Sequence, residues 1–220
     1  MTFRCQTDCE PKQRKEVDNL RLKCYTPFAP RKWGAGREHF EMSKQFRVVD
    51  LAYMAVCAAL IAICSWISIP AAVPFTMQTF AVFCVLGLLG GKRGTVSILV
   101  YILLGAVGLP VFSGFTGGIG ILFGTTGGYI IGFFFVGLIY WGAEKLFGTK
   151  LPIRIAAMVL GLAVCYAFGT AWFMLVYARS SGAIALATAL GWCVLPFIVP
   201  DLVKMGLAVL LSERLRKYLH

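Results

Sequence analysis

The feature that most constrains this chain is a series of apolar runs that starts at Val48 and continues almost to the C-terminus. An α-helix rises 1.5 Å per residue, so about 20 apolar residues cross the hydrocarbon core of a bilayer. Only 14% of the residues are charged, whereas soluble domains have about 25%. We therefore expect an all-α, multi-pass protein of the cell membrane, built as a six-transmembrane-helix bundle. The expected spans are Val48–Ile69, Phe75–Gly91, Thr95–Phe112, Gly120–Ala143, Ile153–Ala178 and Ala183–Leu211.

The basic residues between these runs predict the orientation of the bundle. Lys and Arg concentrate in cytoplasmic loops of membrane proteins. Alternate loops here carry ten basic residues on one side and only Arg179 on the other. Both termini are therefore expected in the cytoplasm. The ten residues are Lys44, Arg47, Lys92, Arg93, Lys145, Lys150, Arg154, Arg214, Arg216 and Lys217.

The first 41 residues differ from the rest, being polar, charged and without an apolar period. This composition is typical of a disordered N-terminal arm. The alternative, which we favour, is a start assigned too far upstream, with Met42 as the true first residue. In either case residues 42–220 are expected to form the transmembrane domain. The arm's cysteines, Cys5, Cys9 and Cys24, have no recognised metal-ligand spacing, so no metal site is expected.

Two charged residues, Asp201 and Lys204, interrupt the last apolar run. A charge at the centre of a membrane helix costs about 2.5–3.5 kcal/mol on insertion scales, so its presence needs a reason. Residues three apart lie on one helical face and can pair. One interpretation is a structural ion pair; the other, which we favour, is a polar ligand site inside the bundle. A carboxylate offers acceptors and an ammonium offers donors, which together suit a cyclic urea or amide.

Pro196 and Pro200 lie just before this pair. Proline lacks an amide donor and disrupts the preceding helical turn. Pro200 can begin a fresh helical segment, with Asp201 in its first turn, where the helix dipole favours a carboxylate; the alternative for the prolines is a simple kink.

Small residues mark two further regions. The glycines from Gly114 to Gly120 indicate a shaped outer loop whose amides could hold an anionic group, whereas Gly128 and Gly132 have the spacing of a close helix contact. Ala55 and Ala59 form a flat patch that could serve internal packing or a partner protein.

Catalytic and nucleotide-binding motifs are not found in the spans. Both histidines, His39 and His220, lie outside them, and the segment GLLGGKRGT lacks the spacing of a phosphate-binding P-loop. We expect no enzyme activity and no cofactor.

Four segments together resemble the BioY family, the biotin-specific S components of energy-coupling-factor (ECF) transporters. The resemblance runs from about Met42 to the C-terminus, and implies the six-helix S-component fold with biotin as the ligand. It also implies an ECF transmembrane scaffold subunit and two ATPase subunits as partners. The segments are VPFTMQTFAV (73–82), LGGKRG (89–94), the glycine-rich stretch Gly108–Phe133, and LPFIVPDLVKMGLA (195–208).

The resemblance assigns roles to particular residues. Asp201 and Lys204 match the family's ligand-binding DxxK stretch, and Ala55 and Ala59 match an alanine pair implicated in docking to the scaffold subunit. Further lining residues are expected in the outer half of the spans because they are polar or aromatic: Gln78, Phe115, Thr126 and Tyr129. One departure is Thr125, where the family typically has proline, which leaves the start of the fourth span less stiff. The alternatives are an S component for another vitamin and a purely structural membrane subunit.

Overall fold

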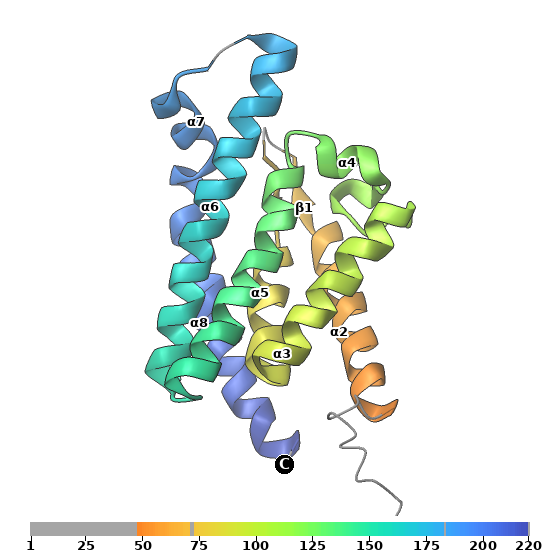
Figure 1. Cartoon of the computed structure of the whole chain (residues 1–220), viewed down its shortest axis with the longest axis vertical. Coiled ribbons are helices and arrows are strands. Elements are labelled where there is room, and N and C mark those ends of the chain that lie inside the picture. The colour runs from red at the N-terminus through yellow and green to blue at the C-terminus, as the bar shows by residue number, and fades with distance from the viewer. Residues whose placement is uncertain (1–47, 71–72, 183, 220) are drawn as a thin grey trace, which may run out of the picture. The chain divides into compact units, whose positions relative to one another are not determined.

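The computed structural model describes residues 48–70, 73–182 and 184–219, so the expected N-terminal arm, 1–41, lies outside the described residues. The described part is a helical bundle (Figure 1). In it, five helices are long and apolar enough to cross a membrane, and one of them carries two of the expected spans. The elements are α2 (Val48–Trp66), β1 (Ser68–Ile69), β2 (Phe75–Thr76), α3 (Gln78–Val107), η1 (Ser113–Phe115), α4 (Ile119–Phe123), α5 (Gly127–Phe147), α6 (Leu151–Ser181), α7 (Leu186–Cys193) and α8 (Leu195–Leu219).

Helix α3 contains the second and third expected spans, which meet at a sharp turn without a loop. Gly90 has φ 77° and ψ 174°, a conformation that residues with a Cβ rarely adopt. The Gln78 side-chain amide donates to the Tyr101 hydroxyl at 3.0 Å, whereas 23 residues of straight helix would separate them by about 35 Å. The chain therefore doubles back at Gly90. Figure 1 shows this reversal within α3, and the six-helix prediction is confirmed.

The last expected span corresponds to one membrane-crossing segment, Leu186–Arg216, but its break lies earlier than Pro200. Helix α7 ends at Cys193, Val194 has a non-helical φ of −125°, and α8 begins at Leu195. Pro200 lies inside α8 and starts no new segment, so Asp201 is beyond the first turn of its helix. The break falls earlier because Pro196, near the start of α8, takes a position where a missing amide donor costs little.

The fourth span is also divided, because α4 and α5 are separate helices. Gly124 has extended backbone between them. The Gly127 amide donates to the Gly124 carbonyl at 3.1 Å, which closes a tight turn into α5.

At one end of the bundle, a hairpin and a long loop join the helices. In the hairpin, β1 pairs with β2 in antiparallel register, Ser68 opposite Thr76. We call residues 108–118 the outer loop. It is fastened to α2, because the Ser65 hydroxyl donates to the Val111 carbonyl at 2.6 Å and the Trp66 indole donates to the Pro110 carbonyl at 2.9 Å.

Helices α5 and α6 pack closely through glycines. A Cβ at Gly128 would overlap Trp172, and one at Gly132 would come within 2.7 Å of the Cys165 sulfur. The expected role of this pair in helix packing is therefore confirmed.

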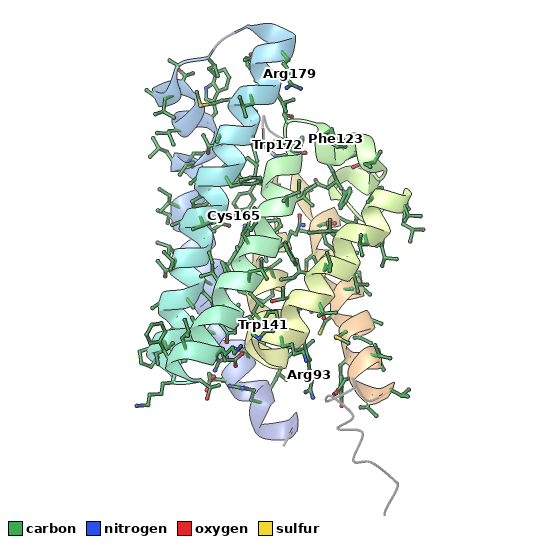
Figure 2. The ribbon with its side chains drawn as sticks, viewed as in Figure 1. Arg93, Phe123, Trp141, Cys165, Trp172 and Arg179 are labelled. Carbon is green, nitrogen blue, oxygen red and sulfur yellow. The ribbon has the colours of Figure 1, made fainter. Side chains whose placement is uncertain are left out.

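The opposite end of the bundle contains a buried arginine that joins several helices. Figure 2 shows Arg93 at this end and Arg179 at the other. Arg154 is buried, with 3% of its surface exposed. Its guanidinium donates to the Tyr140 hydroxyl at 2.7 Å, to the Gly87 carbonyl at 3.0 Å, and to the Glu213 carboxylate. Arg154 thus ties α6 to α5, α3 and α8.

Candidate functional site

A cavity lies in the half of the bundle that carries the hairpin and the outer loop. Its empty space, including open solvent at its entrance, is about 880 Å³. Cys165, on the middle part of α6 in Figure 2, lines it. The largest apolar lining residues are Phe112, Ile121, Ile130, Phe133, Leu162 and Phe197. The polar lining residues are Thr76, Gln78, Thr79, Ser113, Thr116, Thr126, Tyr129, Tyr166, Asp201 and Lys204.

Asp201 lies at the centre of the polar wall. It is 2% exposed, and both of its carboxylate oxygens accept hydrogen bonds. Oδ1 accepts from the Thr79 hydroxyl at 2.9 Å and from Lys204 Nζ at 2.9 Å, while Oδ2 accepts from the Tyr166 hydroxyl at 2.6 Å. Helices α3, α6 and α8 therefore meet at one buried carboxylate. A buried charge of this kind is stable only because it is paired and hydrogen-bonded.

Lys204 connects this carboxylate to the hairpin. Its Nζ donates to the Thr76 carbonyl at 2.7 Å and to the Thr79 hydroxyl at 3.3 Å, in addition to Asp201. The ammonium also lies 3.8 Å from the centroid of the Phe75 ring. The expected one-face arrangement of Asp201 and Lys204 is therefore present, and the ion pair is buried inside the bundle.

Three of the other expected lining residues reach the cavity. Gln78 stands at the start of α3, and Thr126 and Tyr129 stand at the start of α5. The Tyr129 hydroxyl also shares a hydrogen bond of 3.0 Å with Thr170. These residues surround the same space as Asp201, although they come from segments far apart in the sequence.

Phe115 does not line the cavity. Its side chain is 64% exposed and stacks on Trp66, with ring centroids 4.9 Å apart. It has φ 58°, which is uncommon for a residue with a side chain, and follows Gly114 at φ 70°. This local turn directs Phe115 to the outside of the loop, while Phe112 faces inward.

Thr79 and Tyr166 were not foreseen as site residues. Thr79 belongs to the segment VPFTMQTFAV, so its polar side chain at the start of a span was an available signal. Tyr166 lies in a long apolar run, and the sequence alone does not show which face of that run meets the cavity.

The alanine pair of α2 lies away from the cavity wall. Ala55 and Ala59 are exposed, whereas Ala58 and Ala62 are buried against the bundle. The pair therefore presents a flat surface to lipid or to another membrane protein.

The site combines a hydrogen-bonded polar cluster with large apolar side chains in the wall of one cavity. Within the described residues, no three His, Cys, Asp or Glu side chains are grouped so that they could hold a metal ion. The Asp201 carboxylate is well placed to accept a hydrogen bond from a buried N–H group of a ligand.

Comparison with known proteins identifies the family of this chain. The sequence model of the BioY family matches residues 42–220. The chain is 42% identical over 167 residues to the biotin transporter BioY of Thermotoga maritima, covering 74% of this chain and 92% of the relative. It is also 42% identical over 172 residues to the probable biotin transporter BioY of Pyrococcus horikoshii, covering 76% and 96%.

A solved structure shows the same architecture. The S-component for biotin from an ECF-type ABC transporter, in a crystal structure at 2.1 Å, superposes with a TM-score of 0.67 at 32% identity. The match covers 77% of this chain and 92% of that one. This chain belongs to the BioY family.

Proposed function

We propose that this protein is the biotin-binding S component of a vitamin uptake transporter. It captures biotin outside the cell membrane and delivers it across the membrane together with an ECF energising module. Family membership and the names of the relatives support this role, and they make the chain a transporter component and not an enzyme. We also propose that it needs no cofactor, with ATP used by the partner subunits.

The observation that carries the proposal is the buried carboxylate of Asp201 in the wall of a mostly apolar cavity. Biotin joins a cyclic urea to an apolar thioether ring and an aliphatic chain. The urea N–H groups need an acceptor once they leave water, because an unpaired buried polar group costs about 1–3 kcal/mol. Asp201 supplies that acceptor. Lys204 completes the polar end of the site, and Gln78, Thr126 and Tyr129 line its remainder.

The decisive experiment measures biotin affinity by calorimetry on the purified protein in detergent. Asp201→Ala should abolish binding, and Asp201→Asn, which preserves side-chain volume, should weaken it at least about 10-fold. Asp50→Asn is the matched control, since Asp50 pairs with exposed Arg93 at 3.0 Å and is not among the cavity-lining residues. Unchanged affinity in folded Asp201 variants would reject the assignment.

Two alternatives are separated by related measurements. Competition of thiamine and riboflavin against biotin tests whether the ligand is a different vitamin. A purely structural membrane subunit would bind none of them. In contrast, a ligand present at 1,000 times its Kd stabilises the folded state by about 4 kcal/mol and raises the Tm.

The energising module supplies the proposed partners, a scaffold subunit and two ATPases. We propose that Ala55 and Ala59 form part of the docking surface, because they are exposed on α2 and their small side chains permit close approach of another helix. The cavity end then faces outward and both termini face the cytoplasm. The excess of Lys and Arg in the loops on the Arg93 side, against Arg179 alone in the loops on the other side, supports this orientation.

A further inference from the structure

The hydrogen bonds around Asp201 leave its polar cluster with acceptors but no donors for a ligand. Lysine has three N–H groups, and those of Lys204 have three protein acceptors: the Thr76 carbonyl, the Thr79 hydroxyl and Asp201 Oδ1. The Thr79 hydroxyl already donates its hydrogen bond to Asp201. Lys204 is therefore engaged with the protein, and its role is to hold the carboxylate and the hairpin.

The acceptors that remain for a ligand are Asp201 Oδ2 and the Tyr166 hydroxyl oxygen. Oδ1 already accepts two hydrogen bonds, from Thr79 and Lys204. Oδ2 accepts only one that the structure records, from the Tyr166 hydroxyl at 2.6 Å. Tyr166 has committed its hydrogen to Asp201, so its oxygen can act toward a ligand only as an acceptor. Both Asp201 and Tyr166 line the cavity.

We propose that Tyr166 is a specificity-determining residue. Its hydroxyl oxygen and Asp201 Oδ2 form an acceptor pair that accepts a hydrogen bond from a single N–H group of the ligand. This inference rests on the proposed binding of biotin. The two N–H groups of a cyclic urea point in divergent directions, whereas these two acceptor oxygens are 2.6 Å apart, so the pair receives one N–H and not both. The other N–H and the urea carbonyl must find partners elsewhere in the wall.

The test combines a protein variant with altered ligands. The ligands are biotin and its two cyclic carbamate analogues, in each of which one urea N–H is replaced by oxygen with little change of shape. The variants are Tyr166→Phe and, as a second apolar replacement, Tyr166→Leu. Tyr140→Phe is the control, because Tyr140 is also buried and hydrogen-bonded, to Arg154 at 2.7 Å, but is not among the residues that line the cavity.

We expect the unaltered protein to bind one carbamate at least about 10-fold more weakly than biotin, because that analogue faces the acceptor pair without a hydrogen. Tyr166→Phe should weaken the affinity for biotin about 10-fold. The same variant should weaken the affinity for that carbamate less than about 3-fold, since the effects of interacting groups are not additive. Tyr140→Phe should leave the ratio of the two affinities unchanged.

Three results would overturn the inference: equal binding of biotin and both carbamates by the unaltered protein, unchanged biotin affinity in the Tyr166 variants, or an equal loss for all three ligands. The last result would show that Tyr166 only supports the fold. A failure of the unaltered protein to bind biotin would instead reject the proposed function, so the two failures are distinguishable.

Discussion

The ammonium of Lys204 lies 3.8 Å from the centroid of the Phe75 ring, which places a buried cation of α8 directly against the hairpin. Phe75 also stacks on Phe197, with ring centroids 5.9 Å apart. The hairpin is therefore held to α8 by an aromatic side chain that is not itself among the cavity-lining residues.

This relationship predicts the effect of Phe75→Leu. A desolvated cation–π contact contributes about 2 kcal/mol, so its loss should loosen the hairpin and speed biotin dissociation by about 10-fold or more. The measurement is release of radiolabelled biotin after dilution into unlabelled ligand. Phe123→Leu is the control, because Phe123 is 66% exposed on α4. Equal release rates for the two variants would contradict a role of Phe75 in retaining the ligand.

Thr79→Val should weaken biotin binding by roughly 10-fold. The change removes the hydroxyl that donates to Asp201 at 2.9 Å and accepts from Lys204, and a hydrogen bond to a charged group contributes about 1.5–3 kcal/mol. Calorimetry on the purified protein measures the effect. Thr95→Val, after the reversal at Gly90, is a matched control, because Thr95 is buried but donates to the Gly91 carbonyl at 2.7 Å and is not among the cavity-lining residues. A loss of the same size in both variants would show a general effect on folding.

Gly128→Ala should destabilise the pair formed by α5 and α6. The new methyl group would overlap the Trp172 side chain, and overpacking of this kind costs about 1–3 kcal/mol. The expected result is a lower Tm in detergent. Gly142→Ala on the same helix meets no neighbouring atom within 4 Å and should leave the Tm unchanged or slightly raised. Tolerance of the methyl group at Gly128 would mean that the two helices are not in close contact there.

Arg154→Met should also lower stability, by about 1–3 kcal/mol, because it removes the donors to the buried Tyr140 hydroxyl and to the Gly87 carbonyl. The lost pairing with Glu213 adds little, since that side chain is 43% exposed. Arg154→Lys should rescue little, since an ammonium cannot reproduce the planar fork of the guanidinium. Thermal unfolding measures both changes. Arg214→Met, at an exposed position of α8, is the control, and a comparable loss there would contradict a special role for the buried arginine.

Ala55→Trp combined with Ala59→Trp should prevent co-purification with the scaffold subunit while leaving biotin affinity intact. The bulky rings would hold a partner helix away from a surface that now permits close approach. Val159→Trp, at an exposed position of α6, is the control for bulk on the membrane-facing surface. Normal assembly of the double variant would reject the docking role.

Hydropathy and charge predicted much of this fold, because lipid imposes simple rules on composition. The spans, and the placement of Asp201 and Lys204 on one helical face inside the bundle, follow from apolar length and helical periodicity. The contacts of Tyr166 and Thr79 do not follow, since periodicity within an apolar run does not indicate which polar side chain meets a distant carboxylate.

Local backbone geometry explains the remaining differences. Pro200 looked like the start of a helix, but the break occurs at Val194 because the chain enters α8 through Pro196. Phe115 looked like a lining residue, yet the conformations of Gly114 and Phe115 turn its ring outward. Such choices depend on a few dihedral angles and are not encoded in hydropathy.

The single-residue reversal at Gly90 leaves no spare chain between the second and third crossings. Leu86 and Gly94 already touch across it, and the Gly91 amide is held by the Glu144 carboxylate. An epitope or reporter inserted at Gly90 would separate the two segments of α3 that pack against each other. The join between α5 and α6, where Gly148, Thr149 and Lys150 stand outside both helices, is the better place for a tag that reports the sidedness of the membrane.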